Sequence, residues 1–354
     1  MDDQAIGRRE RRAFALDAVG QRAKAAAKAV WWSAAGGLAR AITRPTQGEA
    51  ARSFQPEGAQ VSKERLRRVY LEAFEKDARD VADGLYPAVE DAPTRPVKAL
   101  LRALDFLLDA RAVDQRRRRG DGVEVRSEAE TEAYPNYYRQ NFHYQSGGWF
   151  TAESARRYDT QVEALFAGTA GAMRRRGLSL LAKHWRGRDH RELLIVDAAC
   201  GAGAFLRDLK AAFPRAALAG LDLSSAYLAQ ARRRSGVGMV QANIETLPFA
   251  DGSLDAVSCV YLFHELPPRV RPVVAASIAR SLKPGGVLVF VDSVQPTDEP
   301  NLARLLDAFP AYFHEPYYST YAQTDLAALF SGAGLRLVGE DRAFLTKAML
   351  FEKA

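Results

Sequence analysis

The stretch LLIVDAACGAGAFL, residues 193–206, decides the fold. Residues 193–196 form a wholly apolar run of the kind found in a buried strand of a parallel sheet. Asp197 closes the run, and Gly201 and Gly203 follow among small residues. A helical pattern begins directly after them. A strand, a glycine turn and a helix in this order present backbone N–H groups to a ligand.

Further apolar runs follow at intervals that are typical of an alternating α/β chain. The second run ends in Asp222, about twenty residues past the glycines, where a Rossmann-type fold places the carboxylate that binds ribose hydroxyls. Leu206 stands where a dinucleotide site would have its third glycine, which argues against such a site. The predicted elements after the first strand are a helix over 204–212 and strands over 216–221, 238–241, 254–262 and 286–291.

Together these motifs resemble those of the class I S-adenosylmethionine (SAM)-dependent methyltransferases. The segment 197–203 resembles the glycine-rich first motif of that family, and Asp222 matches its ribose-binding acid. Asn243-Ile244 matches the pair that flanks adenine, and Lys283-Pro284-Gly285-Gly286 matches the turn before the fifth strand. The resemblance covers about the last half of the chain and does not identify a substrate.

The resemblance implies an α/β fold with a Rossmann-like, mostly parallel seven-stranded sheet and helices on both faces. Strands over 336–344 and 347–351 would form an antiparallel pair at one edge. Ala199 stands where the family often has glycine, and we expect an ordinary backbone angle there. The residues expected to bind SAM are Asp197, Ala199, Cys200, Gly201, Gly203, Asp222, Leu223, Asn243, Ile244 and Tyr261.

The first third of the chain carries helical signals and almost no strand signals. Helices are predicted over 61–81, with Ser62 as N-cap, and over 97–108, with a linker over 47–58. Trp31 and Trp32 lie in an apolar stretch that predicts a helix packed on its own domain, or alternatively one lying on a membrane or partner. We therefore divide the chain into a helical domain (1–132), a lid segment with a connecting helix (133–177) and a SAM-binding domain (178–354).

Residues 134–150, YPNYYRQNFHYQSGGWF, form a dense aromatic block, followed by a predicted helix over 152–175. By resemblance this block is a lid over the cofactor; the alternative is a hydrophobic seam between domains. A second aromatic block, 309–318, is expected above the same strand ends. The residues expected to contact the substrate or form the lid are Asn141, Phe142, Tyr144, Tyr158, His314 and Tyr317.

Catalytic candidates follow from the same geometry. His264 comes after the fourth strand, at the ligand edge of the sheet, and can act as a general base or simply cap the next helix. Tyr138 and His143 are the other candidates. Aromatic faces attract a sulfonium as they attract ammonium ions, and about two of five rings are expected to contact the ligand. Those rings belong to Tyr138, Phe142, Tyr144, Tyr261 and Tyr317.

Composition excludes some classes of partner. The net charge is +7 at pH 7, but the arginine run 116–119 lacks interleaved aromatics and is interpreted as an exposed loop, so nucleic-acid binding is not expected. No apolar run reaches the roughly 20 residues of a membrane span. The two cysteines suggest no disulfide framework, which favours a cytoplasmic protein. No clustered metal-ligand spacing is present, and the sequence does not indicate an oligomeric state.

The sequence thus predicts a SAM-dependent methyltransferase acting on a small-molecule acceptor by in-line displacement. An alternative is an enzyme of the same fold that cyclises the aminobutyryl chain of SAM to azetidine-2-carboxylate and releases methylthioadenosine. A third is a non-catalytic SAM-binding scaffold, against which the intact cofactor motifs count. The dense aromatic segments are compatible with both methyl transfer and cyclisation of SAM.

Overall fold

A seven-stranded sheet forms the centre of the computed structural model, which describes residues 60–89, 96–127 and 134–354 and isolated residues between 20 and 55. The strands are β1 (Leu194–Ala198), β2 (Ala217–Asp222), β3 (Gly238–Gln241), β4 (Leu254–Val260), β5 (Leu282–Ser293), β6 (Leu335–Ala343) and β7 (Thr346–Lys353). Their order is β3-β2-β1-β4-β5-β7-β6; β7 pairs antiparallel with both β5 and β6, and the other pairings are parallel. The predicted sheet, with its antiparallel pair at one edge, is confirmed.

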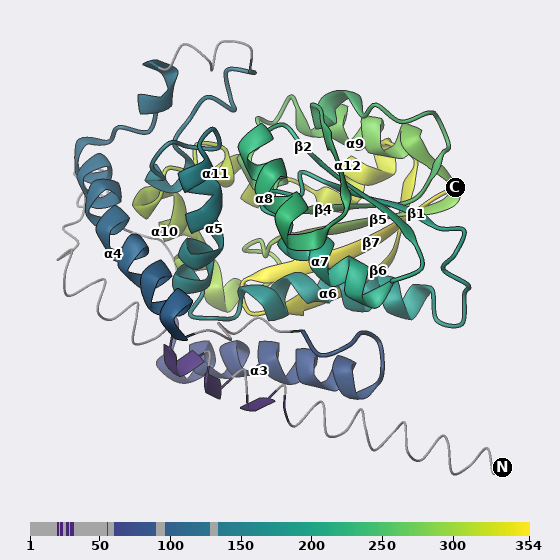
Figure 1. Ribbon diagram of the computed structural model, residues 1–354, viewed down its shortest axis with the longest axis horizontal. Helices are drawn as coiled ribbons and strands as arrows, with labels where there is room; N and C mark the ends of the chain where they lie inside the picture. The colour runs from purple at the N-terminus through teal and green to yellow at the C-terminus, as the bar shows by residue number, and fades with distance from the viewer. Residues whose placement is uncertain are drawn as a thin grey trace.

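Helices cover both faces of this sheet (Figure 1). On one face Leu178 and Leu209 pack against the strands, and on the other Ile278 and Phe330 do so. The α-helices of residues 60–354 that the structure describes are α3 (Lys63–Ala82), α4 (Pro96–Arg119), α5 (Ala152–Leu165), α6 (Ala170–His184), α7 (Ala204–Ala212), α8 (Ser225–Ser235), α9 (Arg271–Ser281), α10 (Ala303–Tyr312), α11 (Tyr318–Ala322) and α12 (Leu326–Gly332). Short 3-10 turns are η1 (Glu124–Ser127), η3 (Phe142–Tyr144), η4 (Ile244–Thr246), η5 (Phe263–Glu265) and η6 (Pro300–Leu302).

The strand and helix predictions of the second half agree closely with these bounds. The helix over 204–212 coincides with α7, and the strand over 238–241 coincides with β3. The largest difference is in β5, which already begins at Leu282 and contains the turn residues 283–286. Buried parallel strands form continuous apolar runs, and the sequence pattern therefore located them well.

One predicted helix is wrong. The pattern over 152–175 indicated a single helix, but the chain reverses between α5 and α6. Ala167 and Gly168 adopt positive φ angles of 49° and 89°, which end α5 and redirect the chain. Helix α6 then lies against β5, β6 and β7 with nearly all of its residues buried. The proposed domain boundary at 177/178 falls inside this helix.

The described helices of the first third agree with the prediction at α3. Ser62 caps it by accepting a hydrogen bond of 3.1 Å from the backbone N–H of Arg65. Helix α4 is longer than predicted, since it runs to Arg119. The predicted linker over 47–58, except Gln55, and Trp32 lie outside the described residues. None of the helices in the described part of the chain is both long and apolar enough to cross a membrane.

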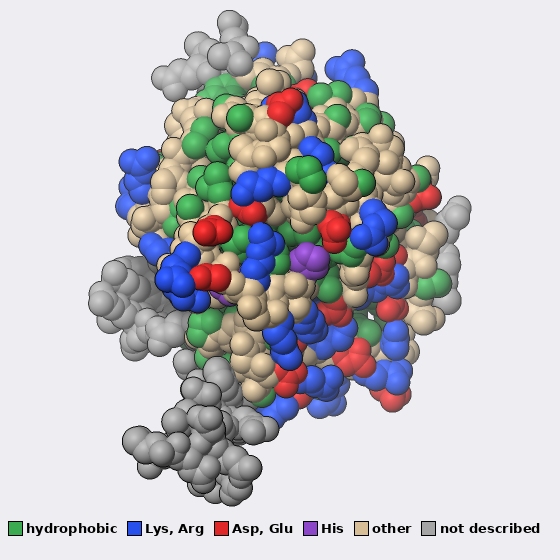
Figure 2. Space-filling view, turned by 90° about the vertical axis from the view of Figure 1, so that its right-hand side faces the viewer, with side chains coloured by type: hydrophobic (Ala, Val, Ile, Leu, Met, Phe, Trp, Pro, Cys, Tyr) green, Lys and Arg blue, Asp and Glu red, His purple; other side chains and the backbone are tan. Residues whose placement is uncertain are grey.

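The arginine run 116–119 is the last turn of α4, which contradicts its interpretation as an exposed loop. Arg116 is buried, and its guanidinium has partners there. It donates hydrogen bonds to Ser146 Oγ at 2.8 Å and to the carbonyl of Tyr144 at 3.2 Å, and it also pairs with Glu124. This arginine therefore ties α4 to the aromatic block. On the face drawn in Figure 2, Lys and Arg side chains are intermixed with Asp and Glu.

Helix α3 docks on the rest of the molecule through a buried ion network. Arg175 of α6 donates two hydrogen bonds, of 2.6 and 2.7 Å, to the carboxylate of Asp77 in α3. The neighbouring Arg176 pairs with Asp80 of α3 at 2.8 Å and with Asp341 of β6 at 3.4 Å. Charges that are out of contact with water need partners of this kind. The network therefore fixes α3 against α6 and β6.

Candidate active site

A cavity opens at the carboxyl ends of β1, β2 and β4. The chain moves outward from β1 in both directions along the sheet, so this edge is the topological switch point where open α/β sheets bind ligands. Asp197 from β1, Asp222 from β2 and Tyr261 after β4 all line the cavity. The elements that the sequence placed at the ligand edge therefore do meet there.

The glycine turn between β1 and α7 gives its two glycines different environments. A Cβ atom added to Gly201 would have no heavy atom within 4 Å, so this glycine faces the open cavity. A Cβ added to Gly203 would lie 2.8 Å from the backbone of Ala231 in α8. Gly203 does not line the cavity. It permits close packing of α7 on α8, whereas Gly201 leaves room for a ligand.

Ala199 does not have the ordinary backbone angle that was expected for it. Its φ is 57°, in the left-handed region that favours glycine. A non-glycine residue in this conformation costs roughly 1–2 kcal/mol. Ala199 lines the cavity between Asp197 and Gly201, so the strain is located in the turn that faces the ligand.

We expect Ala199→Gly to raise the free energy of unfolding by about 0.5–1 kcal/mol. Relief of the left-handed strain exceeds the entropy that glycine adds to the unfolded chain. Urea denaturation measures the change. Ala211→Gly, on the exposed side of α7, is the matched control and should lower stability by about 0.5–1 kcal/mol. A loss of stability in both variants would contradict the strain at Ala199.

Two carboxyl groups line the cavity, that of the buried Asp197 and that of the half-buried Asp222. Asp222 accepts hydrogen bonds from the backbone N–H of Gly201 at 2.8 Å and of Ser224 at 2.9 Å, which fix its orientation. Burial raises the pKa of Asp222, although these bonds oppose the shift. Asp197 accepts a bond from Ser258 Oγ at 2.6 Å, while its other oxygen is buried without a partner. Burial raises the pKa of Asp197 to about 7.

Asn243 and Ile244 form another part of the cavity wall, after β3. The side-chain oxygen of Asn243 accepts a bond of 3.0 Å from the backbone N–H of Glu245, which starts η4. Tyr137 closes over this wall and donates a bond of 2.6 Å to Glu245 Oε1. The wall therefore connects a strand end with the aromatic block 134–150.

That aromatic block supplies part of the cavity lining through Tyr137, Tyr138 and Trp149. It is anchored to the segment after β2, because Ser224 Oγ donates a bond of 2.5 Å to the carbonyl of Trp149. Of the five rings expected near a sulfonium, Tyr138 and Tyr261 line the cavity and the other three do not. The motion of this block as a lid stays a prediction.

The remaining residues expected in the lid, apart from Tyr158, lie outside the cavity lining. Tyr158 lines it from α5. Asn141 is buried and holds the block together through bonds to the backbone of Val125 and Gln145 at 3.1 and 2.9 Å. Phe142 packs with Trp149 and lies outside the lining. Tyr144, His314 and Tyr317 also lie outside the lining.

The two aromatic blocks contact each other, while the expected place of the second block above the same strand ends stays a prediction. His314 Nε2 and Gln140 Oε1 are 2.9 Å apart, and the backbone N–H of His143 donates a bond of 3.3 Å to the carbonyl of His314. The rings of Phe309 and Phe313 contact that of His143 edge-on. The second block therefore packs against the first, and none of its residues lines the cavity.

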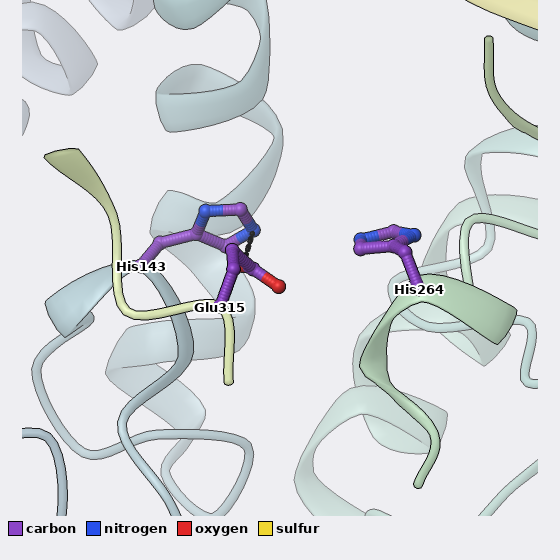
Figure 3. Close-up of side chains that lie close together, drawn as sticks. All are labelled: His143, His264 and Glu315. Atoms are coloured by element: carbon purple, nitrogen blue, oxygen red, sulfur yellow. Dashed lines mark ion pairs between the residues drawn. The ribbon is translucent and has the colours of Figure 1, made fainter. Parts of the chain in front are cut away.

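His143, His264 and Glu315 form a group that we call the His–His–Glu cluster (Figure 3). His143 Nε2 lies 3.1 Å from Glu315 Oε1, and the ring of His264 faces them from another element. Burial lowers the pKa of His143 to about 3 and raises that of Glu315. Burial alone would lower the pKa of His264, but Asp292, 2.6 Å from its Nδ1, raises it to about 10.

Glu265 links the cluster to the cavity, and sequence reasoning missed it. It lines the cavity, and its Oε1 lies 3.9 Å from His264 Nε2. Its position next to a candidate histidine at the end of β4 was an available signal. The sequence analysis also missed Trp149, Tyr137 and Ser224, because no local sequence pattern distinguishes a cavity-lining residue within an aromatic or loop segment.

Comparison with known proteins gives a consistent result. A family model described as "Methyltransferase domain" matches residues 195–286. Demethylmenaquinone methyltransferase of Beutenbergia cavernae is 30% identical over 203 residues, covering 52% of this chain and 80% of the relative. Ubiquinone/menaquinone biosynthesis C-methyltransferase UbiE of Methylobacterium nodulans is 32% identical over 162 residues, covering 44% and 62%.

The share of each relative that is matched varies widely. The chain spans 26–64% of the length of the first four curated relatives. Among solved structures, human N-acetylserotonin methyltransferase in complex with SAM aligns with a TM-score of 0.43 and 14% identity, covering 58% of this chain and 57% of the other. Residues 195–286, which the family model matches, contain the glycine turn and the cavity walls of β1, β2 and β4.

Proposed function

Because the chain belongs to the class I SAM-dependent methyltransferases, whose cofactor is SAM, we propose that it transfers a methyl group from SAM to a small-molecule acceptor. The observation that carries the proposal is the half-buried carboxyl of Asp222, oriented by two backbone N–H groups at the wall of a switch-point cavity. Ribose hydroxyls are donors that suit such an acceptor.

The chemistry of the cavity fits SAM. Gly201 has open space beside it, where a side chain would otherwise stand. The unpartnered oxygen of Asp197 suits a cationic or hydrogen-bonding group of the ligand. Asp222 would hold the ribose, Asn243 and Ile244 would flank the adenine, and Asp197 with the turn at Gly201 would hold the methionine end. The sequence motifs led to the same expectation that these residues bind SAM.

Bound SAM supplies an electrophilic methyl group on a positively charged sulfur. The rings of Tyr138, Tyr158, Tyr261 and Trp149 line the cavity, and aromatic faces attract such a charge. They also exclude water, so that an acceptor held in line behind the methyl group can be the only nucleophile in reach. Tyr138 keeps its proton, because burial raises its pKa well above 10.

The identity of the acceptor follows from no motif. Relatives carry the names of quinone C-methyltransferases and of a fatty-acid O-methyltransferase, which supports a small organic acceptor. Methyl transfer breaks the sulfur–methyl bond, forms a bond from the acceptor to the methyl carbon, and releases a proton where the acceptor atom carries one. Catalytic roles for His264, Tyr138 and His143 stay predictions; of these, Tyr138 lines the cavity.

The products formed from SAM test the proposal. The protein is incubated with SAM alone and with SAM plus demethylated quinone, phenol, carboxylic-acid and amine acceptors, and nucleosides are analysed by mass spectrometry. We expect S-adenosylhomocysteine to form catalytically only when an acceptor is present. Asp222→Ala should reduce its rate at low SAM concentration, because binding of the ribose is weakened.

Two results would contradict methyl transfer. Accumulation of methylthioadenosine from SAM alone, above buffer decay and lost in Asp222→Ala, would identify cyclisation of the aminobutyryl chain instead. SAM binding without turnover of any acceptor, in protein that is fully folded, would favour a SAM-binding scaffold. The three outcomes are distinguished by which nucleoside appears and by whether an acceptor is needed.

A further inference from the structure

We propose that the His–His–Glu cluster binds a divalent transition-metal ion such as Zn²⁺, Fe²⁺ or Mn²⁺ through His143, His264 and Glu315. Two imidazoles and one carboxylate are a ligand set that these ions use in proteins. One ligand atom from each of the three residues lies within 4.8 Å of the others. The inference concerns a site outside the cavity lining and does not depend on methyl transfer.

The geometry of Glu315 carries the proposal. Its side chain is fully buried, and neither carboxylate oxygen has a hydrogen-bond partner. Oε1 is 3.1 Å from His143 Nε2, but the angles do not make this a hydrogen bond. A buried carboxylate without a donor is costly. Two acceptor atoms that approach each other without bonding are arranged like ligands that converge on a common ion.

His264 is oriented as a metal ligand by a second carboxylate. Its Nδ1 lies 2.6 Å from Asp292 Oδ1, and Asp292 also accepts a bond of 2.9 Å from the backbone N–H of Phe263. A histidine that bonds a carboxylate through one ring nitrogen presents the other nitrogen to the metal. In Figure 3 the His264 ring faces Glu315 across the gap between their elements.

The backbone around the cluster is held in an unusual conformation. His143 and Tyr144 both have a φ of 55°, in the left-handed region that residues other than glycine rarely adopt. The bond from the His143 N–H to the carbonyl of His314 joins the two loops that carry His143 and Glu315. This strained turn directs the His143 ring toward the carboxylate.

The required adjustment is small. Ligand atoms at about 2.0–2.2 Å from one ion lie roughly 3–3.5 Å from each other. His143 and Glu315 already have this separation, so His264 needs to approach by at most about 1.3–1.8 Å. Three protein ligands leave coordination positions open for water or for an oxygen or nitrogen atom of an acceptor. Glu265, 3.9 Å from His264, connects these positions with the cavity.

Cobalt titration tests the site directly. Full-length protein is freed of metal with a chelator and titrated with Co²⁺, whose visible absorption reports coordination by protein side chains. We expect one equivalent to bind and Zn²⁺ to displace it. Glu315→Gln, His143→Gln and His264→Gln should each weaken binding more than about 100-fold, and Asp292→Asn about 10–100-fold. No SAM or acceptor is present, so a failure of methyl transfer is a separate result.

Matched variants and a wild-type measurement exclude loss of folding as the cause. His184→Gln and Glu153→Gln alter exposed residues away from the cluster and should bind Co²⁺ like the wild type. Thermal denaturation compares the folding of all variants. X-ray absorption at the cobalt edge of the wild type should show two imidazole ligands. Absence of stoichiometric binding, an imidazole-free spectrum, or unchanged affinity in folded Glu315→Gln would overturn the proposal.

Discussion

Arg175→Met should lower the free energy of unfolding by about 3–5 kcal/mol, among the larger effects expected for a single substitution. The Arg175 side chain is 2% exposed, and its guanidinium donates two hydrogen bonds to Asp77 and lies 3.5 Å from Asp208. Methionine keeps much of the volume but leaves two buried carboxylates without this cation. Burying charge without its partner costs more than the hydrogen bonds alone. Urea denaturation followed by circular dichroism measures the change.

An exposed ion pair provides the control. Arg156→Met removes the partner of Glu153 on the outer side of α5, where the two side chains are 53% and 55% exposed. Because water screens this pair, the expected loss is below about 1 kcal/mol. Equal effects of Arg156→Met and Arg175→Met would mean that the buried network does not fix α3 to α6. The ratio of the two losses in unfolding free energy therefore measures how much burial increases the stabilisation by an ion pair.

Asp222→Ala should weaken SAM binding by about 1–3 kcal/mol, because ribose hydroxyls lose a charge-assisted partner in a buried site. This corresponds to roughly a 5- to 150-fold rise in the dissociation constant. Asp222→Asn retains one side-chain oxygen without the charge, and we expect an intermediate effect. Isothermal titration calorimetry of SAM against the wild type and the two variants provides the measurement.

The matched control for Asp222 is Asp251→Ala. The Asp251 side chain is 78% exposed, in the turn before β4, and it pairs with Arg280 outside the cavity. SAM affinity should be unchanged in this variant. Because Asp222 also binds the backbone N–H groups of Gly201 and Ser224, thermal denaturation must accompany the titration. Equal SAM affinity of Asp222→Ala and the wild type would remove the ribose assignment.

The local sequence was sufficient where one physical cause acts within a short segment. Buried parallel strands form apolar runs, and their helices begin after small or capping residues, so β1 to β4, α7 and the Ser62 cap were predictable. The place of Asp222 in the cavity wall was predictable, because the last residue of a parallel strand lies at the ligand edge of the sheet. The same reasoning located Gly201 beside the cavity.

Errors arose where distant contacts choose among local conformations. The helical pattern continues through Ala167 and Gly168, but the packing of α5 and α6 on different neighbours requires a reversal there. The arginines at the end of α4 resembled an exposed loop, yet Arg116 is buried and donates hydrogen bonds to Tyr144 and Ser146, 28 and 30 residues away. Ala199 adopts a left-handed angle because the turn between β1 and α7 imposes it, whatever residue is present.

The sequence by itself determined the strands, by family resemblance the antiparallel pair at one edge of the sheet, and the carboxylates and glycines at its carboxyl edge. The tertiary structure alone decided which side chains share one space. His143, His264 and Glu315 come from three segments that are more than fifty residues apart, and no spacing rule joins them. Local periodicity shows which segments form strands, whereas a cluster of side chains depends on how loops close over the sheet, which local residue patterns do not specify.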